Sequence, residues 1–250
     1  MSTHAATAAA VPQKTPLLQS RLGSFLAMVP LSIWVVNHLW DNLAAYTCAQ
    51  AWQSAVTEYK HPYAQAFTFV LVMLPLLIHT VWGLLRLRPS GFKPNNLAYP
   101  YYGNVKYIVQ RVAGLGVLGF LGAHIWLAFL QPRLVYGQAE PFAAIAYEMH
   151  FHPPTIIVYT LGVLGTAYHL ANGVQGFAMG WGLLASERSM RRFEPWSIAI
   201  FLVLLGMGWG ALFALYKAGG TEEIMRRHDE IVAARKAAHE PVGTPAPTTH

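Results

Sequence analysis

The sequence predicts an all-α integral membrane protein, built as a bundle of five transmembrane helices. Hydrophobic residues make up 54% of the 250 residues and charged residues only 11%, whereas a soluble chain carries about 25% charged residues. Apolar runs of roughly 20 residues, long enough to cross the hydrocarbon core of a bilayer, recur along the chain. The formal charge of +6 comes from basic residues scattered at the ends of these runs. That placement is typical of membrane topology and does not favour nucleic-acid binding.

The five predicted spans are separated by short connections and flanked by two tails. Their expected ranges are Leu22–Tyr46, Ala64–Leu87, Tyr107–Leu130, Thr155–Leu184 and Trp196–Tyr216. Pro153 and Pro154 suit the first turn of the fourth span, where a missing N–H has the least effect. We predict residues 1–20 as an N-terminal cytoplasmic tail, 21–217 as the transmembrane domain, and 218–250 as an external tail. Within that tail, Thr221–His239 is expected to form a short surface helix.

Lysine and arginine residues indicate which side of the membrane each end faces. If the N-terminus is cytoplasmic, the inner segments hold nine of them between Lys14 and Arg192. The two outer connecting loops, the second of which is Arg133–His152, hold only Lys60 and Arg133. Five basic residues in the C-terminal tail are offset by five acidic ones. The positive-inside rule therefore predicts a cytoplasmic N-terminus.

Four histidines lie within predicted spans, one in each of the first four: His38, His79, His124 and His169. Ionisable residues inside a membrane are costly and usually mark function, although a single histidine often forms only an interhelical hydrogen bond. The rise of an α-helix places His38 and His124 roughly 24–25 Å from the cytoplasmic side. It places His79 and His169 roughly 21–22 Å from the outer side. The histidines therefore form an outer pair and an inner pair, about 15 Å apart in depth.

Two neutral imidazoles at one depth on different helices are the axial ligands that a bis-histidine haem needs on its opposite faces. We therefore predict two b haems stacked across the membrane, one at each pair. A proton relay would more naturally include buried acidic residues, and these spans hold almost none. The single cysteine, Cys48, excludes an internal disulfide and an iron–sulfur cluster, which takes about four thiolates.

Two glycines and one arginine are candidates for further contacts with a haem. Gly165 and Gly173 lie four residues before and after His169 and share its helical face, where they would let a broad macrocycle approach the backbone. Close helix packing explains the same glycines equally well. Arg111 lies one turn inside the third span, and we predict that it pairs with a haem propionate because a charge there needs a partner. Snorkelling to the inner headgroups is the alternative.

Several segments, taken in order, resemble the dihaem cytochrome b subunit of bacterial succinate dehydrogenases and fumarate reductases. They are Arg21-Leu22-Gly23-Ser24, Asn37-His38-Leu39, Leu74-Pro75-Leu76-Leu77-Ile78-His79, Gln110-Arg111-Val112-Ala113-Gly114, Ala123-His124-Ile125-Trp126, Tyr168-His169-Leu170-Ala171-Asn172-Gly173 and Trp181-Gly182. The similarity runs from about Leu18 to Tyr216 and is to the single-polypeptide type with five helices. The two tails and the Arg133–His152 loop match by no motif.

The resemblance implies the same ligand pairs and a membrane-anchor subunit in the bacterial cytoplasmic (inner) membrane. It implies a flavoprotein subunit with FAD and an iron–sulfur subunit as partners, docked on the cytoplasmic face. The expected substrate is quinone, with menaquinone favoured, and this chain would have no catalytic residue for dicarboxylates. Whether the complex oxidises succinate or reduces fumarate stays open.

Quinone reduction requires a proton donor near the reducing haem. The candidates near the outer ends of the spans are Asp41, Asn42, Glu58, Glu148 and His150. For each of these, an ordinary solvated side chain is the alternative. Three other functions also stay open: a haem b anchor of a hydrogenase or formate dehydrogenase, a transporter with histidine proton switches, and a haem-free anchor.

Overall fold

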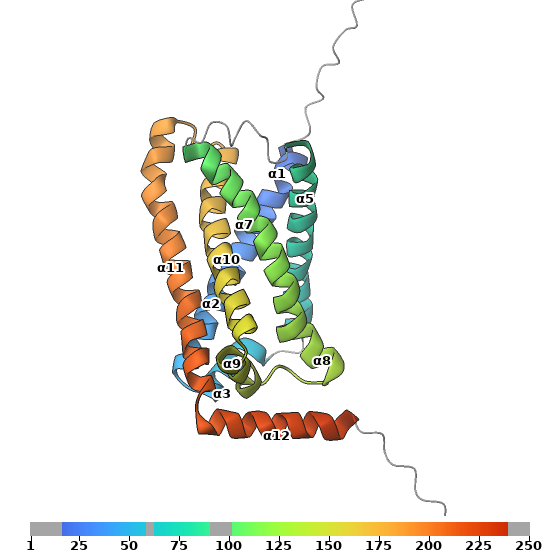
Figure 1. Cartoon of the computed structure of the whole chain (residues 1–250). Coiled ribbons are helices and arrows are strands. Elements are labelled where there is room, and N and C mark those ends of the chain that lie inside the picture. Colours follow the sequence, from blue (N-terminus) through green and yellow to red (C-terminus); the bar gives the residue numbers. More distant parts are fainter. Residues whose placement is uncertain (1–16, 59–62, 91–101, 240–250) are drawn as a thin grey trace, which may run out of the picture.

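The structure, a computed structural model, describes residues 17–58, 63–90 and 102–239. Within these ranges the chain forms helices and no strand. Five helical segments are long and apolar enough to cross a membrane: Arg21–Tyr46, Ala64–Leu87, Gly103–Val135, Pro153–Gly180 and Glu187–Gly219. They stand side by side as a bundle (Figure 1). The predicted fold class is confirmed.

The first two spans are each assembled from several helical pieces. The first comprises α1 (Leu17–Leu26), a π-helical turn (Ala27–Leu31), α2 (Ser32–Asn42) and a 3₁₀ turn (Leu43–Tyr46). The short α3 (Ala49–Trp52) and a second π-helical turn (Gln53–Thr57) follow it. The second span comprises α4 (Ala64–Thr68), a π-helical turn (Phe69–Met73) and α5 (Leu74–Ser90).

The remaining helices complete the bundle and close one end of it. The third span comprises α7 (Tyr102–Ile125), a π-helical turn (Trp126–Leu130) and α8 (Gln131–Val135). The short α9 (Phe142–Phe151) leads into α10 (Pro153–Gly180), the fourth span, and α11 (Glu187–Gly219) is the fifth. The chain then turns into α12 (Glu222–His239), which lies across the end of the bundle (Figure 1).

Prolines accompany the π-helical turns of the first three spans. Pro30 lies within the first turn, and Pro75 and Pro132 each follow a turn by two residues. Because proline has no N–H, the carbonyl four residues earlier loses its usual partner, and the backbone can widen locally into an i→i+5 pattern. The spans therefore continue as helices past their prolines.

The structure moves some predicted boundaries. The fourth span has its two prolines in the first turn, as predicted, but ends at Gly180 and not at Leu184. The fifth begins at Glu187, nine residues before Trp196, because the Ser186 hydroxyl accepts a hydrogen bond from Ser189 N in a capping box. Within the predicted loop Arg133–His152 the chain forms α9, whereas the surface helix predicted near the C-terminus is confirmed.

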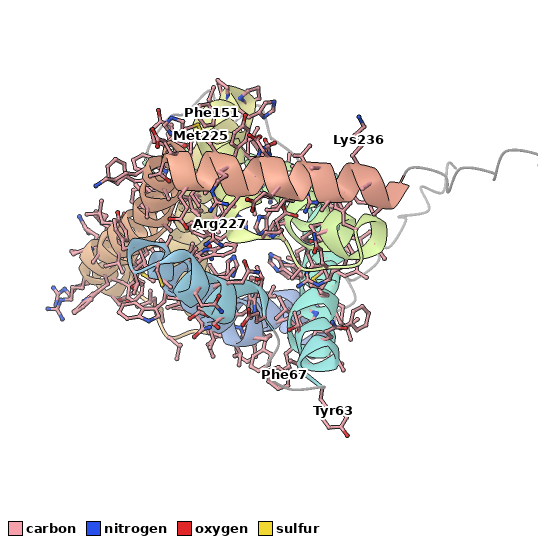
Figure 2. All side chains as sticks on the ribbon, turned by 90° about the horizontal axis from the view of Figure 1, so that it is seen from below. Tyr63, Phe67, Phe151, Met225, Arg227 and Lys236 are labelled. Carbon is pink, nitrogen blue, oxygen red and sulfur yellow. The ribbon has the colours of Figure 1, made fainter. Side chains whose placement is uncertain are left out.

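The best-packed part of the bundle is the end covered by α12, referred to below as the α12 end. Met149 and Ala146 of α9 are fully buried there, and Ile224 of α12 belongs to the same apolar cluster. Elsewhere the spans present large apolar side chains outward, such as Ile33 and Leu77, as expected of surfaces that face lipid. Figure 2, which views the α12 end, shows α12 crossing over the other helices, with Lys236 pointing away from them.

Polar contacts also hold α12 against the bundle. The rings of Tyr147 on α9 and His228 on α12 stack with centroids 3.6 Å apart. The Arg235 guanidinium lies 3.3 Å from a Glu140 carboxylate oxygen and 4.0 Å from the centroid of the Tyr136 ring. Burial raises the pKa of Glu140, and the charge of Arg235 opposes that rise. The ion pair therefore limits the cost of placing a carboxylate under α12.

We expect Arg235→Met to destabilise the protein more at pH 8 than at pH 5. Burial raises the pKa of Glu140 in the folded protein, so folding favours its neutral form. The stability that comes from this neutral form is lost as the pH rises through the folded pKa. Without Arg235 the pKa rises further, and the unpaired carboxylate should cost about 1–3 kcal/mol at pH 8. Thermal unfolding in detergent at both pH values measures this. A loss independent of pH would contradict it, and Glu140→Gln combined with Arg235→Met should abolish the pH dependence.

Candidate functional site

The four intramembrane histidines meet in two pairs across the bundle. His79 on α5 faces His169 on α10, with ring centroids 6.2 Å apart and ring planes at 68°. His38 on α2 faces His124 on α7, with centroids 5.9 Å apart and planes at 64°. These are the same pairs that the depth estimate predicts. Each pair joins two different helices, and together they involve four of the five spans.

The two pairs lie at different levels of the bundle. His79 contacts Gly23, near the start of the first span, at the end opposite α12. His124 contacts Tyr159, which is in the second turn of α10, toward the α12 end. Because α10 has His169 ten residues further along, the two levels are separated by about 15 Å on that helix. We call them the inner pair (His79 and His169) and the outer pair (His38 and His124).

Backbone carbonyls determine which nitrogen carries the proton in the inner pair. His79 Nδ1 lies 3.0 Å from the carbonyl oxygen of Gly23, and His169 Nδ1 lies 3.3 Å from that of Gln110. A carbonyl can only accept, so Nδ1 of each ring donates and Nε2 keeps a free lone pair. A Cβ at Gly23 would collide with the ring of Trp82, so glycine permits the close approach that brings this carbonyl to His79.

Aromatic and polar side chains surround the outer pair. His124 Nδ1 lies 3.2 Å from the hydroxyl of the buried Tyr159. The ring of Phe120 stacks beside His124, with centroids 5.5 Å apart. Trp34 stacks on His38 at 4.6 Å and 9°. Asn42 Nδ2 lies 3.4 Å from His38 Nε2. Because an amide N–H can only donate, His38 Nε2 accepts and its Nδ1 carries the proton, as in the inner pair.

The separation of the rings fits a metal held between them. An imidazole nitrogen binds a transition metal at about 2.0–2.1 Å, and adding roughly 1 Å from each nitrogen to its ring centre separates the two centroids by roughly 6 Å. In addition, α2 has few close contacts with α7, and α5 has few with α10, within the described residues. Each pair of rings therefore meets between two helices that have few other close contacts with one another.

The number of ligands also fits a haem. In the part of the chain that the structure describes, His, Cys, Asp and Glu side chains form no group of three or more that could hold a metal ion. Each histidine pair supplies only two ligands, and a porphyrin supplies the other four around its iron. The donor set, the ring separation and the free Nε2 lone pairs of the inner pair all suit haem b.

The predicted glycines lie on the face of α10 that packs against α7. A Cβ at Gly165 would lie 3.4 Å from Val117 Cγ2, and one at Gly173 would lie 3.8 Å from Gln110 Nε2. Both distances are ordinary contacts, so packing against α7 accounts for these positions. The approach to a haem stays a prediction for both. Gly114, the last residue of the Gln110–Gly114 motif, lies directly against the His169 ring.

Basic residues of α7 lie at the end of the bundle opposite α12. The Arg111 guanidinium lies 4.2 Å from the centroid of the Tyr107 ring, and its pairing with a propionate stays a prediction. Lys106 was not singled out from the sequence. Its ammonium lies 2.8 Å from Glu194 of α11 and 2.6 Å from Gln175 of α10, so three helices share one polar cluster inside the bundle.

The five quinone candidates do not form one cluster. Asp41 accepts a hydrogen bond from Asn37 at 2.7 Å, and Asn42 accepts one from Trp52 Nε1 at 3.1 Å. Glu148 lies 3.6 Å from His152 at the start of α10. The carbonyl of Tyr216 on α11 accepts a 2.8 Å hydrogen bond from His150 Nδ1.

Glu58 lies in a different setting from the other four. It lines a cavity of about 820 Å³ at the α12 end, together with Thr57, Gln65, Phe129, Leu130, Arg133, Leu134, Gly137, Gln138 and Ala139. The volume is in the range of ligand sites. Phe129 and Arg133 continue the span that carries His124, so the cavity lies beyond the outer pair along that span.

Comparison with known proteins provides an independent test of the family. No family model matches the chain. The chain is 31% identical over 201 residues to the succinate dehydrogenase cytochrome b558 subunit of Bacillus subtilis (strain 168), a match that covers 78% of this chain and 94% of that protein. The alignment therefore takes in nearly the whole relative, and five apolar helices agree with a membrane component. The chain belongs to the family of cytochrome b membrane-anchor subunits of succinate dehydrogenase.

Proposed function

We propose that this chain binds two b haems and passes electrons between the iron–sulfur subunit of succinate dehydrogenase and quinone. The observation that carries the proposal is the meeting of two histidine pairs, at two levels, on four different spans. When bound, a haem supplies a one-electron redox centre. The chain itself supplies the axial nitrogens, the fixed spacing and the apolar surroundings.

The proposed inner ligands are His79 and His169, and the proposed outer ligands are His38 and His124. Gly23 and Gln110 supply the carbonyls that hold the inner rings. Such acceptors fix the orientation of a ligating imidazole and raise its basicity. Gly165, Gly173 and Arg111 are proposed as further contacts of the inner haem.

The proposed topology places the N-terminus in the cytoplasm and the protein in the bacterial inner membrane. The end opposite α12 would then face the cytoplasm and receive the iron–sulfur and flavoprotein subunits, which hold the clusters and FAD. In this arrangement residues 1–20 are the cytoplasmic tail and 21–217 the haem domain. Residues 218–250 lie outside, where α12 covers the outer end of the bundle. The excess of basic residues in the inner segments supports this orientation.

We propose the cavity lined by Glu58 as the quinone site, with menaquinone as the favoured substrate. Its lining combines apolar side chains with one carboxyl group and one guanidinium. Apolar walls suit a lipophilic ring, and a few polar groups suit its two oxygens. The geometry favours Glu58 over the other four candidates as the proton donor, because it alone among them lines this cavity.

Haem content per chain tests the proposal. The purified complex should give two equivalents of haem b per copy of this chain in a pyridine haemochrome assay, and succinate should reduce haem in the intact complex. A chain without a Soret band would instead support the transporter or the haem-free anchor. Copurification with hydrogenase or formate dehydrogenase subunits would overturn the assigned partners.

A further inference from the structure

Polar side chains connect α7 and α10 beside the inner histidine pair. Gln110 of α7 faces His169 of α10, and three hydrogen bonds link this part of the two helices. His169 Nδ1 donates to the Gln110 carbonyl, while Gln110 Nε2 donates to the His169 carbonyl at 3.0 Å. The Gln110 side-chain oxygen accepts a 2.9 Å hydrogen bond from Asn172 Nδ2. The contact is therefore reciprocal between Gln110 and His169, and Asn172 holds the Gln110 amide in position.

The two hydrogen bonds of the Gln110 side chain have a different role from the hydrogen bond that the His169 ring donates. The acceptor for His169 Nδ1 is a backbone carbonyl, which any residue at position 110 would supply. Its distance and direction, however, depend on how the two helices are placed relative to one another. The Gln110 amide holds that placement, because it bonds to the backbone of His169 itself. In apolar surroundings few other groups compete for these donors and acceptors.

Glycine at position 114 makes the close approach possible. Gly114 lies one turn beyond Gln110 on the same face of α7. A Cβ there would lie 2.9 Å from His169 Cε1 and 3.3 Å from its Nδ1, so a larger residue would push the imidazole away. The His169 ring therefore packs against the backbone of α7 at Gly114, and its Nδ1 is held by the Gln110 carbonyl.

A second cluster anchors the same helices one turn further along. Lys106 lies one turn before Gln110, and Gln175 lies one turn after Asn172. Lys106 Nζ donates to Gln175 at 2.6 Å and to Glu194 at 2.8 Å, and Gln175 is 7% exposed. The two clusters form a continuous polar seam along α7 and α10, which fixes their relative placement near the inner pair.

We propose that Gln110 and Asn172 are positioning residues, acting together as a clamp that holds the imidazole of His169 in place as an axial ligand. The inference rests on the proposed function, since it assumes that His169 binds the inner haem. The clamp keeps Nδ1–H directed at the Gln110 carbonyl, which increases the basicity of the ligating Nε2 and favours the oxidised iron. The clamp acts on the inner site. The neighbours of the outer pair are Tyr159, Trp34 and Asn42, and not the two clamp residues.

The test replaces Gln110 with methionine, which keeps the length of the side chain and removes both of its hydrogen bonds. In the intact complex, the midpoint potential of the inner haem should rise while that of the outer haem stays unchanged. The reduced inner haem should also bind carbon monoxide roughly tenfold more readily than in the wild type, because a less firmly held His169 would dissociate from the iron more easily and leave a position for carbon monoxide. Redox titration and carbon monoxide difference spectra measure the two effects.

Two further variants make the result specific. Asn172→Leu removes only the bond that holds the Gln110 amide, so it should shift the same two readouts in the same direction by a smaller amount. Ser197→Ala is the matched control. The Ser197 hydroxyl donates to the Ala171 carbonyl at 3.1 Å and is buried, so its loss removes a helix–helix hydrogen bond close to His169 without touching the clamp. Both readouts should stay at wild-type values in Ser197→Ala.

The outcomes separate the clamp from the function on which it rests. If the wild type holds two haems but Gln110→Met and Asn172→Leu leave the inner potential and carbon monoxide binding unchanged, the clamp is wrong and the proposed function stands. Equal shifts in Ser197→Ala would also overturn the clamp, because general loosening of α10 would then explain them. If Gln110→Met fails to assemble, Asn172→Leu decides alone. A wild type without an inner haem overturns the proposed function itself.

Discussion

Leucine in place of His169 is expected to leave one haem b per chain where the wild type has two. Leucine fills a similar volume but offers no lone pair, so His79 would face an apolar side chain across the 6.2 Å separation of the two rings. Loss of a partner that merely supports a metal ligand lowers metal affinity by 10–100-fold, and loss of the ligand itself should do more. Reduction of quinone by succinate should fall more than about 100-fold. A haemochrome assay and quinone reductase activity of the intact complex measure both effects.

Two other histidine variants control this experiment. His38→Leu should also leave one haem, but the remaining one should be the inner haem, with its own potential in a redox titration. His152→Ala should retain both haems, because His152 is exposed at the start of α10, where it contacts Thr155 and Glu148. Two full equivalents of haem with unaltered low-spin spectra in His169→Leu would remove the basis for the whole assignment.

The sequence predicts the spans and the histidine pairs because both depend on quantities that vary little between helices. The rise per residue is nearly constant, so counting from the start of a span places His38 and His124 at one level without any knowledge of packing. Ionisable residues are costly inside a membrane and usually mark function, and this singles out the histidines. The five spans are therefore recoverable from composition and order along the chain.

What surrounds each ring cannot be predicted in the same way, because it depends on how the helices rotate about their axes. Nothing in the order of residues indicates that Tyr159 meets His124 or that the carbonyl of Gly23 meets His79. A sequence signal for Gln110 did exist. Polar amides within a span are costly and usually pair across helices, so the rule that identified the histidines also applies to Gln110 and Asn172.

Outside the spans, prediction from the sequence was weakest where short elements pack against the end of the bundle. The predicted loop Arg133–His152 contains α9, which is buried by contacts with α11 and α12. The number of apolar residues in a segment does not predict such contacts. The surface helix predicted near the C-terminus is present as α12, but the sequence does not predict that Ile224, His228 and Arg235 attach it to the bundle. Tertiary packing, and not local propensity, places these segments.

Substitution of Glu58 with glutamine is expected to reduce quinone turnover by about 100-fold while leaving both haems and their reduction by succinate intact. Positioned general acids contribute about 10²–10⁴-fold to rates, and glutamine keeps the shape of glutamate without an acidic proton to give. Glu58 lines the cavity with Arg133 and accepts a hydrogen bond from Ser54 at 2.9 Å. Steady-state quinone reductase activity, with haem reduction followed in the same samples, separates loss of proton delivery from loss of electron supply.

Asp41 provides the matched control, since it is a second carboxyl group near the same end of the bundle. Its carboxylate bonds to Asn37, one turn earlier on α2, and it does not line the cavity. Asp41→Asn should therefore turn over quinone at nearly the wild-type rate. A large loss in Asp41→Asn with none in Glu58→Gln would move the quinone site from the cavity to α2, and no loss in either variant would remove both acidic residues from the proposed proton path. Because Asp41 lies on α2 and does not line the cavity, comparison of the two variants shows which of the two places is the site of quinone reduction.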